Sequence, residues 1–190
     1  MIARFISRFG RFGTAVILLT LAQTLILVWM VGDRIAILRS PDVVTLKSEP
    51  VDPRDLFRGD YVTLTYGISR LPLAEMPGET GFDIGDTIYI ELAAAPGTWN
   101  AVAIYHAYPT PGVGHKVIRG RVVGFTSAPA ILTIAYGIES YFVPEGEGRS
   151  LEEERNARNL SVDIALASDG EAAIKGLRID GEPVYEEPLF

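Results

Sequence analysis

The pattern of apolar and polar residues divides the chain into one long apolar segment followed by short alternating ones. Residues 14–32, TAVILLTLAQTLILVWMVG, carry no charged side chain. A helix rises about 1.5 Å per residue, so a segment of this length just spans the hydrocarbon layer of a bilayer. The pattern therefore predicts a transmembrane anchor helix and its exit over residues 14–38, with lipid as the partner of residues 14–32.

Beyond the anchor, β-branched and aromatic residues gather in short segments separated by glycine, proline and aspartate. This spacing is typical of strands and turns, so we expect a mainly β fold: an N-terminal transmembrane helix followed by a β-barrel or β-sandwich with one short helix. For the first segment a tether is the alternative, but its β-branched residues favour a strand. The predicted strands are Val43–Leu46, Tyr61–Ile68, Thr87–Ala93, Asn100–Tyr108, Lys116–Phe125, Ile131–Ile138, Leu160–Ala167, Ala172–Ile179 and one near Val184.

One segment in the second half has the signals of a short helix. Ser150 is a suitable N-cap and Glu153 completes a capping box with it. Acidic residues come early and arginines late, as the helix dipole favours. We therefore expect a helix over Leu151–Arg158.

Charge is distributed unevenly along the chain. The leader has three arginines and no acidic residue, which favours a cytoplasmic N-terminus and export of the C-terminal part. A cleaved signal peptide is the alternative, but the apolar segment is long for one. We therefore expect a cytoplasmic basic leader (1–13), the anchor (14–38) and an extracytoplasmic acidic β-rich domain (39–190).

The expected exported domain is strongly acidic. Residues 40–190 hold 12 basic and 23 acidic side chains, which give a formal charge of about −11. Such a surface repels nucleic acid, so no nucleic-acid partner is expected. The chain contains no cysteine, which excludes disulfides and a lipoprotein anchor.

The stretch VDPRDLFRGDYVTLTYGIS, residues 51–69, combines a charged half with an alternating half. Asp-Pro-Arg-Asp predicts a single helical turn, and Gly59 allows the corner into the next strand. Because side chains alternate along a strand, one face is apolar and is expected in the core. That face is formed by Val62, Leu64, Tyr66 and Ile68.

The charges of this stretch allow two interpretations. They can neutralise one another and cap backbone N–H groups in a tight loop, which is the favoured interpretation. Alternatively they form a binding surface, because clustered ionisable residues also mark functional sites. The residues of this binding hypothesis are Asp52, Arg54, Asp55, Arg58, Asp60, Tyr61 and Tyr66.

The tripeptide Tyr-Gly-Ile occurs twice, in LTYGIS at residues 64–69 and in IAYGIES at residues 134–140. Two strands that end in the same way explain the repeat, and a duplicated half-domain is the alternative. The flanking sequences diverge, which favours the first explanation.

Residues 59–66 read GDYVTLTY and match GDYxxLxY at every fixed position. On this motif, the anchor, the second Tyr-Gly-Ile and the segment AAIKGLRIDGEPV at residues 172–184, the chain resembles the GDYxxLxY family of bacterial membrane-anchored proteins. The resemblance implies no established activity. It implies the bacterial cytoplasmic membrane, with the N-terminus inside and the domain in the periplasm or outside the cell. It also implies a multispanning membrane protein as partner, because such proteins are often encoded beside family members.

A second, weaker resemblance is to type I signal peptidases, which implies a membrane-tethered serine hydrolase with a lysine base. No serine stands directly before the relevant proline, and Ser48 lies too early. Lys116 begins a strand, where lysine is normally solvated. We therefore expect no catalytic residue. The resemblance rests on the single anchor, KVIRGRVVG at residues 116–124, and Pro53, Leu56, Gly59 and Asp60.

Two other binding sites are weaker alternatives. His106 and His115 could share a metal ion if Asn100–Tyr108 and Lys116–Phe125 formed a hairpin, but exposed histidines outside any metal site are favoured. A cell-wall glycan could stack on an aromatic platform, although core and rim aromatics are favoured. The platform would comprise Trp99, Tyr105, Tyr108, Tyr136, Tyr141 and Phe142.

We therefore expect no cofactor and no metal. The function expected is that of a non-catalytic binding or accessory subunit for a multispanning membrane protein, which would use the loop Asp52–Asp60 and the helix Leu151–Arg158. The signal-peptidase-like hydrolase and the glycan-binding module remain the alternatives.

Overall fold

A computed structural model describes residues 2–49, 61–142 and 159–187, and the chain divides into two compact units, residues 1–36 and 37–190. The first unit is most of the helix α1 (Ile2–Leu38). Within α1, Gly13–Leu38 contains an 18-residue window with a mean hydropathy of 2.2, and no residue of that window is buried by other parts of the protein. These 26 residues make α1 a candidate membrane anchor, as the apolar pattern predicts.

The second unit is built from strands. The described strands are β1 (Val43–Glu49), β2 (Tyr61–Thr63), β3 (Thr65–Tyr66), β4 (Arg70–Pro72), β5 (Thr87–Ala95), β6 (Thr98–Tyr105), β7 (Lys116–Ser127), β8 (Ala130–Ala135), β9 (Ser140–Phe142), β10 (Leu160–Leu166), β11 (Ala172–Ile179) and β12 (Glu182–Glu186). One 3₁₀ turn, η1 (Gly67–Ser69), joins β3 to β4. The mainly β fold class is confirmed.

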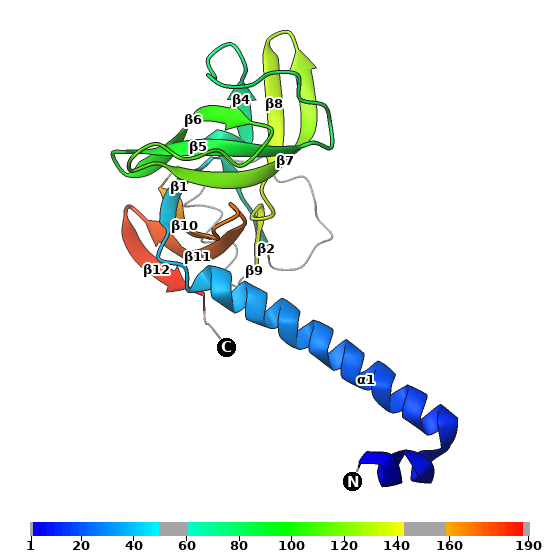
Figure 1. Ribbon diagram of the computed structural model, residues 1–190. Coiled ribbons are helices and arrows are strands. Elements are labelled where there is room, and N and C mark those ends of the chain that lie inside the picture. Colours follow the sequence, from blue (N-terminus) through cyan, green and yellow to red (C-terminus); the bar gives the residue numbers. More distant parts are fainter. Residues whose placement is uncertain (1, 50–60, 143–158, 188–190) are drawn as a thin grey trace. The chain divides into compact units, whose positions relative to one another are not determined.

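Two five-stranded sheets form the two layers of the domain (Figure 1). The order in one sheet is β12-β11-β10-β1-β3, and the order in the other is β4-β8-β7-β5-β6. A short ladder of β2 with β9 completes the pairing, and every ladder is antiparallel.

One hydrophobic core lies between the two layers. Along β1 the buried residues are Val44 and Leu46, and along β5 they include Ile88 and Ile90, so each strand turns every second side chain inward. β10, which lies beside β1 in the same sheet, contributes Leu160, Val162 and Ile164. The alternation visible in the sequence is therefore the alternation that fills the core.

A smaller cluster covers the other face of β10 and β11. Ala165 and Ala173 are fully buried there, against Ile37 and Leu38 from the last turn of α1. Alanine at both strand positions lets the backbone of that turn approach the sheet closely. The final residues of α1 thus belong to the core of the second unit.

One sequence-based expectation about strands is wrong. Residues 61–68 do not form one strand, because the ladder breaks at Leu64 and the chain turns through η1 before the unpredicted strand β4. The hairpin of Asn100–Tyr108 with Lys116–Phe125, which was the condition for a shared metal ion, does not form, because β5 lies between β6 and β7. The predicted helix Leu151–Arg158 lies outside the described residues.

Candidate functional site

The two Tyr-Gly-Ile segments meet in the core and bind each other reciprocally. The Tyr66 hydroxyl donates a hydrogen bond of 2.7 Å to the Ile138 carbonyl, and the Tyr136 hydroxyl donates one of 2.6 Å to the Ile68 carbonyl. Each tyrosine also donates its backbone N–H to the side chain three residues later in the sequence. The Tyr66 N–H donates to Ser69 Oγ, and the Tyr136 N–H donates to Glu139 Oε1. We call this arrangement the tyrosine clasp.

The strands around the clasp follow the same two-fold relation. β2 precedes the first Tyr-Gly-Ile segment and pairs with β9, which follows the second Tyr-Gly-Ile segment. In the same way, β4 follows the first segment and pairs with β8, which precedes the second segment. Both ladders have the same register, so they are two ends of one ladder that opens in the middle. Strand β3 ends at Tyr66 and β8 ends directly before Tyr136, which confirms the prediction of two similar strand ends.

Burial of the clasp has an electrostatic consequence. Tyr66 is 1% exposed and Tyr136 is 7% exposed. Burial raises the pKa of both phenols far above the usual value, and the negative charge of Glu139 adds to both shifts. Each hydroxyl therefore stays protonated and remains a donor to its carbonyl acceptor.

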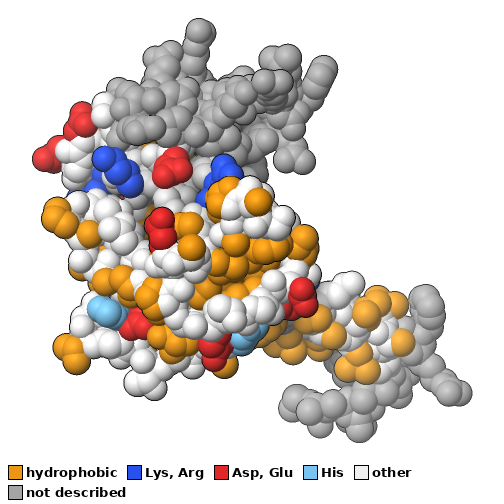
Figure 2. Space-filling model, turned by 90° about the horizontal axis from the view of Figure 1, so that it is seen from above, with side chains coloured by type: hydrophobic (Ala, Val, Ile, Leu, Met, Phe, Trp, Pro, Cys, Tyr) orange, Lys and Arg blue, Asp and Glu red, His pale blue; other side chains and the backbone are white. Residues whose placement is uncertain are grey.

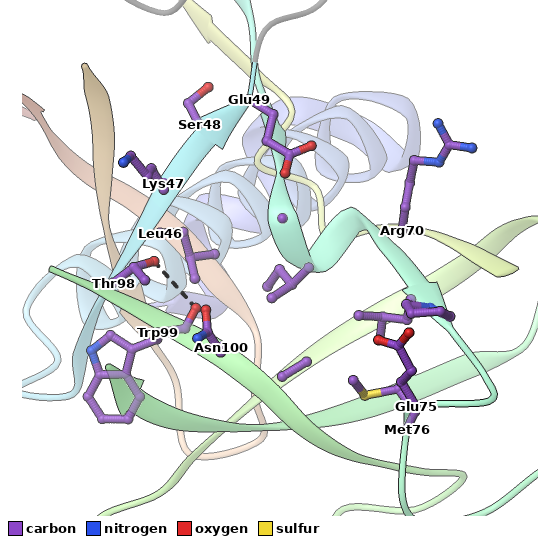
Figure 3. A pocket seen from close by; sticks show the side chains of 15 residues that line it. Leu46, Lys47, Ser48, Glu49, Arg70, Glu75, Met76, Thr98, Trp99 and Asn100 are labelled. Atoms are coloured by element: carbon purple, nitrogen blue, oxygen red, sulfur yellow. Dashed lines mark hydrogen bonds between the residues drawn. The ribbon is translucent and has the colours of Figure 1, made fainter. Parts of the chain in front are cut away.

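The clasp holds one wall of a hollow on the domain, which we call the groove. Gly67 and Ile68 of η1 and the residues of β4 form that wall, and the end of β1 and the start of β6 form the other walls (Figure 3). Its volume is about 590 Å³, within the usual range for ligand sites. The groove is lined by Leu46, Lys47, Ser48, Glu49, Gly67, Ile68, Arg70, Leu71, Pro72, Glu75, Met76, Thr98, Trp99, Asn100 and Ala101.

The floor of the groove is apolar. Leu46, Ile68 and Leu71 are buried beneath it, and Met76 and Trp99 are half-buried against the same core. One polar atom interrupts this surface, because Ser48 is 1% exposed and its Oγ has no hydrogen-bond partner. A buried hydroxyl without a partner is rare and costs free energy, so it marks a place where a ligand donor or acceptor would be gained.

The rim of the groove carries charges of both signs. Lys47, Glu49, Arg70 and Glu75 are exposed, and none of them has an ion-pair partner among the described residues. A Cβ on Gly67 would stand 3.5 Å from Glu49 Oε1, and Figure 3 shows the Glu49 side chain at the end of β1. Among the described residues, these four charges are therefore unpaired.

The groove lies on the seam between the two sheets. β6 is the last strand of its sheet, and on the side of β1 away from β10 only Ser48 and Glu49 pair with a strand. The two strands are linked by a long hydrogen bond of 3.4 Å from Thr98 Oγ1 to the Thr45 carbonyl. A second hollow of about 330 Å³ continues the seam and shares Thr98 and Trp99 with the groove.

The structure places the sequence-predicted binding residues as follows. Tyr66 lies in the core, where its hydroxyl serves the clasp and does not reach the surface. Tyr61 begins β2 opposite Phe142. The residues Asp52, Arg54, Asp55, Arg58 and Asp60 lie outside the described residues.

The lysine and serine of the hydrolase hypothesis stand apart. The ammonium of Lys116 forms an ion pair with Asp42 Oδ1, just before the start of β1. Ser48 lies near the other end of β1, about 16 Å along the strand from Val43 at 3.3 Å per residue. Lys116 is therefore not within reach of the Ser48 hydroxyl, and its charge is already neutralised by a partner.

The two histidines serve separate structural roles. Glu91 Oε1 accepts from His115 Nδ1 at 2.7 Å and from the Gly112 N–H at 2.8 Å, and Glu91 Oε2 accepts from the Tyr105 hydroxyl at 3.1 Å. These donors, the Gly112 N–H first, hold the pKa of Glu91 below its ordinary value. His106 stacks on Phe82 with a centroid distance of 4.0 Å. Within the described residues, no three His, Cys, Asp or Glu side chains come close enough to hold a metal.

The aromatic residues proposed for glycan stacking are dispersed. Tyr136 and Tyr141 are buried, Tyr105 binds Glu91, and Tyr108 packs edge-on against Tyr89 with a centroid distance of 5.7 Å. Only Trp99 lines the groove. Seen from above in Figure 2, charged side chains of both signs are spaced among apolar ones, so this face carries no single-sign patch.

Comparison with known proteins gives one match. A family model described as GDYXXLXY protein matches residues 23–177. No curated protein and no solved structure matches the chain. The matched range includes both Tyr-Gly-Ile segments and every residue that lines the groove.

Proposed function

The chain belongs to the GDYXXLXY protein family, and from this premise we propose that it is a membrane-anchored, non-catalytic binding subunit. In this proposal α1 holds the chain in the bacterial cytoplasmic membrane with its N-terminus inside. The β domain lies on the extracytoplasmic side, where it binds a multispanning membrane protein. The family description names no activity, so the binding role, the partner and the location are part of this proposal.

The length of the apolar helix supports the anchor. Gly13–Leu38 extends about 39 Å at 1.5 Å per residue, which exceeds the roughly 30 Å of a hydrocarbon core. Most of its large side chains are exposed, including Leu25 at 68% and Trp29 at 72%. Exposure of this kind is stable in lipid and unfavourable in water. The three arginines of the leader favour the cytoplasmic N-terminus.

The observation that carries the binding role is the unpaired rim of the groove. Four charged side chains surround an apolar floor, and no described residue neutralises them. Charged rims around apolar centres are typical of protein interfaces. In contrast, the dyad required for hydrolysis is not assembled among the described residues, because Lys116 pairs with Asp42.

Orientation can be tested with a single introduced cysteine, because the natural chain has none. Val113 is fully exposed, so Val113→Cys presents a reactive thiol without disturbing the core. We expect a membrane-impermeant maleimide to label Val113→Cys in spheroplasts, and to label the control Arg8→Cys only after the membrane is permeabilised. The reverse labelling pattern would overturn the proposed orientation.

Partnership can be tested by isolating the full chain from detergent-solubilised membranes of its own bacterium. We expect a multispanning protein to be recovered with the wild type in a constant molar ratio, and to be lost when Glu49→Arg and Arg70→Glu reverse the rim. The matched pair Asp55→Ala and Arg58→Ala tests the loop predicted from sequence, and Glu182→Lys on the exposed end of β12 serves as control. Recovery of no membrane protein at all would refute the binding role.

A further inference from the structure

We propose that the groove binds an extended peptide segment of the partner, which adds as a strand along the free edge of β6. This inference rests on the proposed function and specifies the mode of recognition. The segment expected is apolar at its centre, with side chains of both charges near its ends.

The shape of the seam favours an extended chain over a compact ligand. The groove follows β6 from Thr98 to Ala101, which is about 10 Å of strand. A second hollow borders the same strand at Thr98 and Trp99. A peptide of about four residues in the strand conformation has the length of the groove along β6.

The edge of β6 already binds one extended segment within the same chain. Farther along the strand, the Ile104 N–H donates to the Pro77 carbonyl at 3.1 Å and the Glu79 N–H donates to the Ile104 carbonyl at 2.9 Å. Gly78 forms a parallel bridge with Ile104 between these two bonds. At Thr98–Ala101 no described strand pairs with this edge, and Thr98 Oγ1 donates to the Thr45 carbonyl at 3.4 Å and to the Trp99 carbonyl at 3.5 Å. In this proposal the segment pairs with the outward backbone groups of Trp99–Ala101 in the same way.

The side chains around the groove specify the chemistry of the segment. Leu46, Ile68 and Leu71 provide an apolar floor, and Trp99 provides the large aromatic contact that dominates many interfaces. The unpartnered Ser48 hydroxyl can bind a polar group that reaches the floor. The positive charges of Lys47 and Arg70 would attract an acidic side chain of the segment, and the negative charges of Glu49 and Glu75 would attract a basic one.

The groove can be filled without disturbing the fold. Gly67 has no positive φ that would exclude a side chain, and a Cβ there meets only Glu49 Oε1, at 3.5 Å. Gly67→Leu therefore adds an isobutyl group at a residue that lines the groove, and its Cβ makes only an ordinary van der Waals contact. Thr126→Leu, at an exposed position of β7 that does not line either hollow, is the matched control.

The experiment uses the full chain in nanodiscs and a phage-displayed library of random linear 12-residue peptides. We expect selected peptides with apolar residues at alternating positions, binding wild type and Thr126→Leu equally and Gly67→Leu about tenfold more weakly. Hydrogen exchange with a selected peptide is expected to slow the amides of β6 near Thr98–Ala101 and not those of β12. Equal binding to Gly67→Leu, protection elsewhere, or no selected peptide would overturn the inference.

Isolation of the full chain from membranes distinguishes a failure of the proposed membrane partnership from a failure of peptide binding in the groove. If the membrane partner is recovered with wild type and equally with Gly67→Leu, the groove is not the contact and only the present inference fails. If no membrane partner is recovered while selected peptides protect β6, the groove binds peptides and the membrane-protein partnership fails.

Discussion

Tyr66 and Tyr136 exchange hydrogen bonds: each phenol donates to the carbonyl of the isoleucine that lies two residues after the other tyrosine. Both acceptors are buried, so each bond satisfies a carbonyl that water cannot reach. The last tyrosine of the GDYxxLxY motif is therefore one half of a pair whose other half lies 70 residues later.

Removal of either hydroxyl should destabilise the domain. We expect Tyr66→Phe and Tyr136→Phe each to lower the free energy of unfolding by about 1–3 kcal/mol, because a buried carbonyl loses its donor. Because the two bonds close one arrangement, the double variant should cost less than the sum of the single ones. Chemical denaturation of the full chain in micelles measures this, with the exposed Tyr108→Phe as control. Strict additivity would show that the two bonds act independently.

The same pair predicts sensitivity to alkali. Burial holds the pKa of both phenols far above the unfolded value of 10.0, so unfolding allows both to ionise above pH 10. The stabilisation is complete below pH 10 and decreases as the pH rises further. Between pH 10 and about 11.5 we expect wild type to lose stability more steeply than the Tyr66→Phe, Tyr136→Phe double variant. Parallel pH profiles would contradict this prediction.

Glu91 predicts the opposite sensitivity, to acid. Its folded pKa is held below the ordinary value of 4.5, chiefly by the Gly112 N–H and by His115. This contribution is present above pH 4.5 and is lost as the pH falls through the lower, folded pKa. Wild type should therefore lose more stability than Glu91→Gln below pH 4.5, as measured by thermal unfolding across the pH range. Glu182→Gln, on the exposed end of β12, should follow wild type.

Gly78 and Gly81 provide a matched pair of positive-φ glycines, at φ +114° and +84°. A Cβ on Gly78 would lie 2.2 Å from the Ile104 carbonyl oxygen, whereas one on Gly81 meets nothing within 4 Å. Gly81→Ala should cost only the backbone strain, about 1–2 kcal/mol. Gly78→Ala should cost more, because the bonds that cover β6 at Ile104 must also break. Equal losses in thermal unfolding would show that this segment is not held by Ile104.

The position of Lys116 predicts the result of an activity-based test. Its ion pair with Asp42 keeps the ammonium occupied at the far end of β1 from Ser48. We expect a fluorophosphonate probe to label the wild-type chain no more than Ser48→Ala in isolated membranes. Labelling that disappears in Ser48→Ala would support the serine-hydrolase alternative.

Sequence periodicity was sufficient to predict most of the strands. Short runs rich in β-branched and other apolar residues locate β5, β7, β10 and β11, because the composition that favours a strand is a local property of the chain. The order of the strands is not local. Nothing in the residues of β6 and β7 reveals that β5 lies between them, so the sequence alone could not exclude the hairpin required for a shared metal ion.

The candidate site was harder to predict than the fold. The groove combines Ser48, Gly67 and Trp99 from segments far apart in the sequence, and each residue alone resembles an ordinary strand or turn residue. The Tyr-Gly-Ile repeat was the available signal for its wall, but sequence alone does not show that the two tyrosines bind each other. The charged residues between Asp52 and Asp60 drew attention in the sequence, and they lie outside the described residues.

The uncovered part of β6, at Thr98–Ala101, also affects how the protein behaves during production. An exposed strand edge can join the same edge of another molecule and start aggregation. If the proposed partner covers this edge, copies made in excess over that partner would be the first to associate in this way. Overexpression of this chain alone should then yield more insoluble material than balanced co-expression with the proposed partner.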